Sequence, residues 1–544
     1  MRALRYWHTL RHLKPVQFYG RVRFKLARPA PDAAPAPALR APGTWVTPAA
    51  VKPSLLGPDH VRFLNVDGTL SAGWEPAGAA KLWTYNLHYF ADLAAEDAAQ
   101  RAAWQRQMMA QWIQGNPPGE GTGWEPYPLS LRVVNWLKWH MAGNTLDAAA
   151  LHSLAMQVRW LERRLEWHLL GNHLFVNAKA LVLAGLFFQG PEAARWLRLG
   201  ARILLEQIPE QVLADGGQFE RSPMYHALAV EDMLDLCNAL RCWQHALQPD
   251  ERASAAALAA QVEPRVQPMR HWLAVMSHPD GEIAFFNDAA TGIAPSNAQL
   301  DGYAQRLGFG AAPAVAEGLT HLADSGFVRL QLGPAVALVD VAPVGPDYLP
   351  GHAHADTLSC ELSVHGARVV VNSGTSEYGA GAERLRQRGT AAHSTVVVNS
   401  ADSSEVWGGF RVARRAHPRG LEMAQEGGAL TVTCWHDGYQ RLPGRPVHRR
   451  TWRMDRAGLR VTDHVDRAQT ASVRWHLAPH VKVEGAGPFT LALPSAQRVA
   501  LAVQGATCTR VASTYHPAFG IVQPTTLLDC AMTGSECVSG FSWS

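Results

Sequence analysis

The residue pattern of the chain changes once, near residue 315, and this change limits the possible folds most strongly. From about Lys81 to Gly310, apolar residues recur at three- and four-residue spacing, as in ALHSLAMQVRWLERRLEWHLL, which predicts amphipathic helices. After LTHLADSG, apolar residues alternate in short β-branched runs such as ARVVVN and STVVVN, separated by Gly, Pro, Asp or Asn. Helical hairpins followed by a run of strands predict two separate domains and not an interleaved α/β fold.

The pattern divides the chain into three parts. We expect a basic segment and a Pro/Ala-rich wrap over residues 1–80, a helical domain over 81–315 and an antiparallel β-sandwich over 320–544. A chain of 544 residues is longer than one hydrophobic core supports, which agrees with more than one domain.

Charge and apolar run length argue against a nucleic-acid partner and a transmembrane segment. The net charge of +4 argues against a nucleic-acid partner, and the longest apolar run, ALVLAGLFF, is too short for a transmembrane segment. The basic start, MRALRYWHTLRHLKPVQFYGRVRFKL, has no continuous apolar region of a secretory signal. We therefore expect a cytoplasmic location, with the periplasm as the alternative. This start can pack on the protein body or lie on an anionic membrane, and packing is the preferred interpretation.

Cysteine and tryptophan usage adds two expectations. The seven Cys are scattered without a CxxC motif, so we expect neither a zinc module nor a disulfide framework. The 19 Trp supply core volume, and indole rings also stack on sugars.

The stretch GNHLFVNAKAL, residues 171–181, places three polar residues in an otherwise apolar helix. Burying an unpaired polar group costs about 1–3 kcal/mol. Asn172, His173 and Asn177 are therefore either satisfied in a core or face a cleft. We expect Asn172 and His173 to face a cleft and Asn177 to serve the packing behind them.

Two further polar clusters stand out. DGGQFERSPMYH brings together Glu220, Arg221 and Tyr225, and the start of the sheet domain carries His352, His354, Asp356, Asn372, Arg388 and His393. A single His or Asn on an apolar face is more often a satisfied core residue. Polar clusters from both domains together favour a cleft at the domain junction, which is a common place for a site.

Five motifs carry a family resemblance: YNLHYFADL, GNHLFVNAKAL, DGGQFERSPMYH, GHAHADTLSCELSV and AAHSTVVVN. With them the chain resembles the heparinase II/III-type polysaccharide lyases. The resemblance implies an (α/α) toroid, an incomplete helical barrel, followed by an antiparallel β-sandwich. The Asn-His pair followed about fifty residues later by Tyr225 is its most specific element.

The resemblance implies β-elimination on an acidic polysaccharide that contains uronic acid, in bacterial exopolysaccharide or capsule metabolism. Asn172 would neutralise the uronate carboxylate, as an oxyanion hole does. Tyr225 would act as base and acid if positive neighbours lowered its normal pKa of about 10. His173 or His352 would supply that lowering or act as the base on the opposite C5 epimer.

Substrate binding is expected from residues around this centre. Arg221 and Arg388 are candidates to hold anionic groups. Glu220 and Asp356 are candidates to orient a His or Arg. The remaining candidates are Tyr85, Asn86, His88, Trp124 and Arg132. Ordinary helix packing is the alternative for each of these five.

The resemblance also implies a divalent metal, zinc or calcium, in the sheet domain. By position, His354, Asn372 and His393 match the metal ligands. Asn372 departs from the family pattern, because a carboxylate is the usual residue there and a neutral amide is a poorer zinc ligand. The alternative is that the three side chains only form hydrogen bonds at the domain interface.

Two other functions stay open. A glycoside hydrolase needs two carboxylates that flank the bond, and Glu220, Glu125 and Asp356 are the obvious suppliers. The third interpretation is a polysaccharide-binding or assembly protein without turnover. The sequence predicts no oligomeric state.

Overall fold

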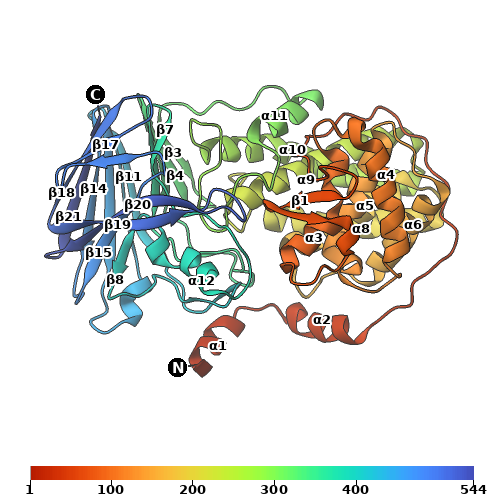
Figure 1. Cartoon of the computed structure of the whole chain (residues 1–544), viewed down its shortest axis with the longest axis horizontal. Helices are drawn as coiled ribbons and strands as arrows, with labels where there is room; N and C mark the ends of the chain where they lie inside the picture. Colours follow the sequence, from red (N-terminus) through yellow and green to blue (C-terminus); the bar gives the residue numbers. More distant parts are fainter. Residues whose placement is uncertain (1, 544) are drawn as a thin grey trace.

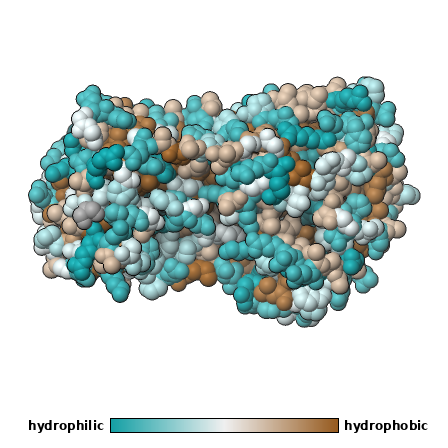
Figure 2. All heavy atoms as spheres, turned by 90° about the horizontal axis from the view of Figure 1, so that it is seen from above, coloured by the Kyte–Doolittle hydropathy of each residue, from teal (hydrophilic) through white to brown (hydrophobic). Residues whose placement is uncertain are grey.

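The computed structural model describes residues 2–543, which form a helical lobe and a sheet-rich lobe next to each other (Figure 1). Seen from above, the two lobes are joined at a narrower waist, and hydrophilic side chains spread over both (Figure 2). Among the described residues, no helix is long and apolar enough to cross a membrane.

The helical lobe consists of α3 (Lys81–Tyr89), α4 (Ala102–Gly115), α5 (Pro126–Met141), α6 (Ala148–Arg163), α7 (Gly171–Phe187), α8 (Pro191–Gln211), α9 (Pro223–Trp243), α10 (Pro249–Val275) and α11 (Asn297–Arg306). Helix α7 contacts α5, α8 and α9. It is buried along nearly its whole length, because apolar residues such as Leu174, Ala178 and Leu181 surround its axis. This central helix carries the first polar motif.

The N-terminal part of the chain runs along the helical lobe (Figure 1). It contains α1 (Arg2–Leu10), α2 (Pro15–Leu26), β1 (His60–Phe63) and β2 (Val66–Thr69). Between α2 and β1 the chain is extended, and Leu39 forms a β-bridge with Phe188 at the end of α7. Arg40 is buried beside this bridge and forms an ion pair of 2.8 Å with Glu251. The wrap is thus held by backbone pairing and a buried charge pair.

The sheet lobe contains three larger antiparallel sheets. The first is β3 (Gly318–Leu322), β4 (Phe327–Leu332), β5 (Ala335–Asp340), β6 (Cys360–Val364) and β7 (Ala367–Val370), in that order. The second has the order β19 (Ala506–Tyr515), β20 (Gln523–Met532), β15 (Ala471–His476) and β8 (Val396–Val398). A bridge between Val370 and Leu477 joins these two sheets.

The third sheet has the order β11 (Pro418–Glu426), β12 (Ala429–His436), β13 (His448–Asp455), β14 (Gly458–Val465), β21 (Glu536–Trp543), β18 (Arg498–Gln504), β17 (Phe489–Ala492) and β16 (Lys482–Glu484). It packs on the other sheets through Trp475 of β15, whose ring lies 5.1 Å from that of Phe541. This is the expected sandwich. Between β7 and β11 the chain forms helix α12 (Ala382–Arg388) and the short pair β9 (Val406–Trp407) and β10 (Arg411–Val412).

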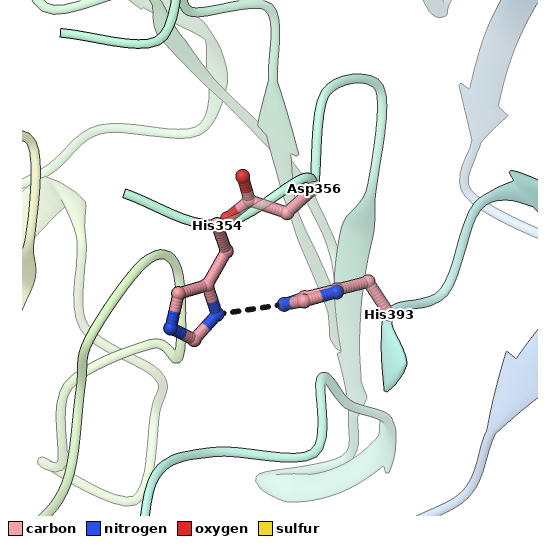
Figure 3. Close-up of side chains that lie close together, drawn as sticks. All are labelled: His354, Asp356 and His393. Atoms are coloured by element: carbon pink, nitrogen blue, oxygen red, sulfur yellow. Dashed lines mark hydrogen bonds between the residues drawn. The ribbon is translucent and has the colours of Figure 1, made fainter. Parts of the chain in front are cut away.

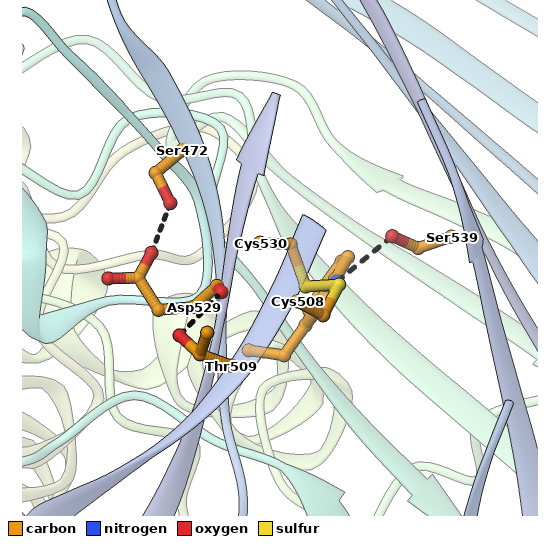
Figure 4. Close-up of a disulfide and its surroundings, with 7 residues drawn as sticks. Ser472, Cys508, Thr509, Asp529, Cys530 and Ser539 are labelled. Atoms are coloured by element: carbon orange, nitrogen blue, oxygen red, sulfur yellow. Dashed lines mark hydrogen bonds between the residues drawn. A yellow bond between two sulfur atoms is a disulfide. The ribbon is translucent and has the colours of Figure 1, made fainter. Parts of the chain in front are cut away.

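One disulfide joins the hairpin of β19 and β20 (Figure 4). The antiparallel register places Cys508 opposite Cys530, with their Cα atoms 3.9 Å apart. The scattered Cys spacing did not predict this pair, because the register of a hairpin decides which residues meet. The other five Cys are free and buried.

Candidate active site

A cleft of about 2250 Å³ lies between the helical lobe, the sheet lobe and the N-terminal helices. Asn172, His173 and Tyr225 line it from the helical lobe, and His352 lines it from the sheet lobe. Four residues predicted from distant motifs therefore share one cavity.

Asn172 and His173 reach the cleft because α7 starts with an unusual turn. Leu170 and Gly171 both have a left-handed backbone, with φ values of 63° and 53°. The positive φ of Gly171 favours glycine, and a Cβ atom there would also lie 2.2 Å from Leu349 Cδ2, so that the leucine side chain would have to move. The first turn of α7 thereby exposes both polar side chains to the cavity, and Asn172 has no side-chain hydrogen bond to any of the described residues.

Asn177 serves the structure behind them, as expected. It is fully buried, and its Nδ2 donates to Glu166 Oε2 at 3.1 Å while its Oδ1 accepts from the Glu166 backbone N–H. Glu166 Oε1 lies 3.1 Å from His173 Nδ1. Burial lowers the pKa of His173, but the carboxylates of Glu166 and Glu220 outweigh burial and raise the pKa above 6.5. His173 is therefore disposed to carry a positive charge.

Tyr225 and His352 meet across the domain junction. Their rings are stacked with centroids 3.9 Å apart. Ser222 caps α9 by accepting from the Tyr225 backbone N–H, which places the tyrosine in the first turn. His352 Nδ1 lies 2.5 Å from Glu220 Oε2, and Glu220 is 1% exposed. Glu220 thus orients His352 and leaves Nε2 as its basic nitrogen.

Tyr378 belongs to this centre although no motif predicted it. Its Oη is hydrogen-bonded to Tyr225 Oη at 3.0 Å, and its side chain also lines the cleft. Burial raises the pKa of Tyr225 well above 10, and the neighbouring phenol of Tyr378 adds to the rise. The condition for a lowered Tyr225 pKa is not met, because burial, the phenols of Tyr378 and Tyr127 and the carboxylate of Asp288 all raise the pKa. The only sequence signal of Tyr378 is a tyrosine in a Gly-rich loop, GTSEYGAG.

Two of the weaker candidates, Tyr85 and Asn86, line the cleft. Tyr85 donates its hydroxyl to Glu125 Oε2, and Asn86 Nδ2 donates to Leu82 O at 2.8 Å. Tyr127, which the motifs did not single out, lies between them and the centre, with its ring 4.4 Å from that of His173.

Three other candidates are core residues, so the prediction that they bind substrate was wrong. His88 is fully buried, and its ring nitrogens lie 3.0 Å from Trp74 O and Trp112 Nε1. Arg132 is also fully buried and donates to Gln157 Oε1, His88 O and Gly123 O. Trp124 is 4% exposed and donates to Asn116 O. Their polar atoms are already satisfied by the protein.

Arg221 and Arg388 also lie outside the cleft, contrary to the prediction. Arg221 Nε donates to Ser325 O, which ties the helical lobe to the sheet lobe. Arg388 is fully buried, and it donates twice to Ala353 O and once to Gly408 O. Arg388 therefore holds the loop next to His352 and does not reach a ligand.

A cluster of His354, Asp356 and His393 lies in the sheet lobe, close in sequence to His352 (Figure 3). One ligand atom from each lies within 4.8 Å of the others, and His354 Nδ1 is 3.0 Å from His393 Nε2. The other ring nitrogen of His354 lies 2.8 Å from Asp288 Oδ1, an arrangement that is common behind metal-binding histidines.

Asn372 is hydrogen-bonded at both ends of its amide, and its ligand role stays a prediction. Its Oδ1 accepts from Ser394 N at 3.0 Å and its Nδ2 donates to Phe285 O at 2.9 Å. Both ends of the amide thus bind backbone atoms, and the carboxylate that lies with His354 and His393 is that of Asp356.

Comparison with known proteins agrees with this arrangement. Residues 81–306 match the family description "Heparinase II/III N-terminus", and residues 314–544 match "Heparinase II/III-like, C-terminal". A heparin-sulfate lyase of Bacteroides stercoris is 26% identical over 326 residues, which cover 56% of this chain and 45% of that protein. The match therefore spans less than half the length of that relative.

Solved structures show the same fold. A crystal structure of heparinase III is 17% identical, with a TM-score of 0.68 over 88% of this chain and 79% of that one. A heparan sulfate lyase from Pedobacter heparinus is 18% identical, with a TM-score of 0.56 over 86% of this chain and 78% of that one. With both halves of the chain matched and a toroid followed by a β-sandwich, this protein belongs to the heparinase II/III family.

Proposed function

We propose that this protein is a polysaccharide lyase that cleaves an acidic, uronic-acid-containing glycan by β-elimination. The proposal rests on one observation: Asn172, His173 and Tyr225 of the helical lobe share a cleft with His352 of the sheet lobe. These side chains supply the three functions that elimination needs, namely charge neutralisation, a base and an acid.

Charge neutralisation is assigned to the start of α7. The proton on C5 of a uronate is too weakly acidic while the adjacent carboxylate keeps its full negative charge. Asn172 would donate a hydrogen bond to that carboxylate, and His173 would pair with it as a cation, because its pKa is raised. Both interactions become stronger as charge develops on the carboxylate in the enolate-like intermediate.

The base and the acid are assigned to His352 and Tyr225, whose rings are stacked. His352 Nε2 would take the C5 proton while Glu220 holds Nδ1. The C4–O bond then breaks as the C4–C5 double bond forms. Tyr225 would donate its phenolic proton to the departing O4, and its raised pKa keeps that proton in place beforehand. This division of roles replaces the expectation that Tyr225 alone acts as both base and acid.

A divalent metal fits the cluster of His354, Asp356 and His393, whose donor set of two imidazoles and a carboxylate suits zinc. We assign these three residues as its ligands. When bound, the metal would cross-link the His352 loop to the segment before β8 and so keep the base in position.

Hydrolysis is the weaker alternative. It needs two carboxylates beside the bond. Among the described residues, Glu125 and Asp356 do not line the cleft, and Glu220 is bound to His352. The cleft therefore has no carboxylate pair of the required kind among the three predicted suppliers.

The test is ultraviolet absorbance of the C4–C5 double bond during incubation with heparan sulfate, hyaluronan, chondroitin, alginate, glucuronan and bacterial exopolysaccharides. We expect one of them to give rising absorbance. Tyr225→Phe should lower kcat by about 100-fold or more, because it removes the general acid. Tyr19→Phe, an exposed tyrosine on α2, is the matched control and should keep full activity.

New reducing ends without absorbance would show hydrolysis and overturn the proposal. Binding of a glycan without any cleavage would show a binding or assembly protein. Full activity of Tyr225→Phe would remove Tyr225 from the chemistry.

A further inference from the structure

The two N-terminal helices expose an unusual amount of apolar surface. Eight of the fourteen exposed large hydrophobic side chains in the described part of the chain lie on them: Leu4, Tyr6, Trp7, Leu10, Phe18, Tyr19, Val22 and Leu26. Figure 1 shows α1 and α2 below the two lobes, at the outer surface of the molecule. Soluble proteins rarely leave contiguous apolar patches in water without a partner.

Helix α2 holds its apolar residues in one outward stripe. Phe18, Val22 and Leu26 follow four-residue spacing and are 50%, 59% and 78% exposed. The opposite face is fastened to the protein, because Gln17 donates to Tyr348 O and the Phe24 ring lies 4.3 Å from the ring of His168. The stripe therefore cannot turn inward without breaking these contacts.

The same segment is strongly cationic. Residues 1–31 contain eight Lys and Arg and no Asp or Glu. Arg21, Arg23 and Lys25 are exposed beside the stripe. Among the Lys and Arg side chains of residues 3–31, Lys14 is the only one that forms an ion pair, with Glu210. Most of these positive charges are thus available to a partner.

We propose that α1 and α2 form a docking surface for an anionic lipid bilayer. Apolar side chains flanked by cations are the pattern by which short amphipathic helices lie in a membrane interface. The stripe of Phe18, Val22 and Leu26 enters the acyl boundary, while Arg21, Arg23 and Lys25 contact lipid phosphates. Trp7 and Tyr19 suit the headgroup level, where aromatic rings with a polar edge concentrate.

Docking would place the cleft next to the bilayer. Four residues of the two helices also line the cleft: Tyr6, Leu10, Gln17 and Arg21. Tyr6 also packs on Trp407 of the sheet lobe, with ring centroids 5.1 Å apart. A glycan carried at the membrane surface would therefore reach the cleft without crossing bulk water.

The test is cosedimentation of the full-length protein with vesicles of phosphatidylcholine, with or without phosphatidylglycerol. We expect binding only to the anionic vesicles and weaker binding at high salt. The triple variant Phe18→Ser, Val22→Ser, Leu26→Ser should reduce partitioning by about tenfold or more. Val522→Ser removes an equally exposed valine, 59%, from the sheet lobe and should bind like the wild type.

A second variant, Arg23→Glu with Lys25→Glu, tests the charges independently and should weaken binding by about fivefold per residue or more. Failure of the wild type to bind anionic vesicles would overturn the proposal. If the triple variant binds anionic vesicles as well as the wild type does, the binding is unspecific charge attraction, and the proposed docking surface is overturned as well. A wild-type dimer that the triple variant converts to a monomer, without lipid binding, would assign the surface to a second copy of the chain.

Discussion

At the scale of single residues, the side chains of the cleft depend on partners that do not touch it. Asn177 is fully buried and holds Glu166, and Glu166 in turn raises the pKa of His173. In the same way Glu220 orients His352. A polar residue in an apolar helix is therefore informative even when it faces the core, because it can position a carboxylate that acts on the site.

The ion pair of His173 with Glu166 predicts that both stability and KM depend on pH. Since its folded pKa is raised above 6.5, the stabilisation from pairing with Glu166 is complete below pH 6.5 and is lost as pH rises through the folded pKa. Loss of the His173 charge should raise KM by about tenfold over the same range. In Glu166→Gln this rise in KM should move to lower pH. An unchanged pH profile of KM would contradict the role of Glu166.

Replacing the orienting carboxylate predicts a loss of rate. Glu220→Gln has the same shape but no charge, so the His352 imidazolium that forms during proton abstraction loses its counter-ion. We expect kcat to fall by about 100-fold with little change in KM or melting temperature. Steady-state kinetics with a thermal melt measure this. A fall in melting temperature that accounts for the lost activity would instead assign Glu220 a purely structural role.

At the scale of elements, the ends of helices and the loops after strands position the site. Helix α7 begins with the left-handed Leu170 and Gly171, and α9 begins at the Ser222 cap, so both helices direct their first turns to the cleft. In the sheet lobe, the His352 loop is held by Arg388 from the end of α12. This explains why an arginine next to a site motif serves a backbone carbonyl and not a substrate.

Arg388 supplies the element-scale prediction. Arg388→Lys cannot keep all three bonds to Ala353 O and Gly408 O, so the free energy of unfolding should fall by about 2–4 kcal/mol. Chemical denaturation measures this, and Arg498→Lys at an exposed position is the control. If Arg388 instead bound substrate, KM would rise and the unfolding free energy would stay unchanged.

At the scale of the whole molecule, the site exists only where the two lobes meet. Tyr225 comes from α9, whereas His352 and Tyr378 come from the sheet lobe more than a hundred residues later. The cluster of His354, Asp356 and His393 lies in the same junction, because Asp288, on the segment between α10 and α11, holds His354. The chemistry and the docking of the two lobes are thus linked.

If His354, Asp356 and His393 bind zinc, zinc should raise the stability of the whole protein. Zinc at about 100 times its Kd should raise the free energy of unfolding by about 2.7 kcal/mol. His393→Ala and Asp356→Asn should abolish this rise and lower the bound zinc, while His464→Ala at an exposed position should not. Thermal melts with and without a chelator, with elemental analysis, measure both effects. Zinc stabilisation that survives both ligand variants would contradict the assignment.

The sequence by itself determined the order of the domains and the identity of four cleft residues. Helical and strand periodicity are local properties, so the change near residue 315 is visible in the sequence itself. The toroid and the sandwich were expected from the family resemblance that the motifs carry. Asn172, His173, Tyr225 and His352 stand in motifs whose polar residues contrast with their neighbours. The predicted cytoplasmic location stays a prediction.

Only the tertiary structure decided which polar side chains are satisfied by the protein itself. Arg132 and Arg388 are residue types that often bind anionic ligands, but all three nitrogen atoms of each guanidinium donate to protein oxygens from distant segments. Asp356 lies with His354 and His393, although the motifs did not single it out as their neighbour, because spacing along a chain does not reveal which side chains converge. The same holds for Tyr378, whose hydroxyl reaches Tyr225 only after the lobes have docked, and for the raised pKa of Tyr225, which burial produces. Burial and long-range contact are properties of the packed molecule, and no local pattern encodes them.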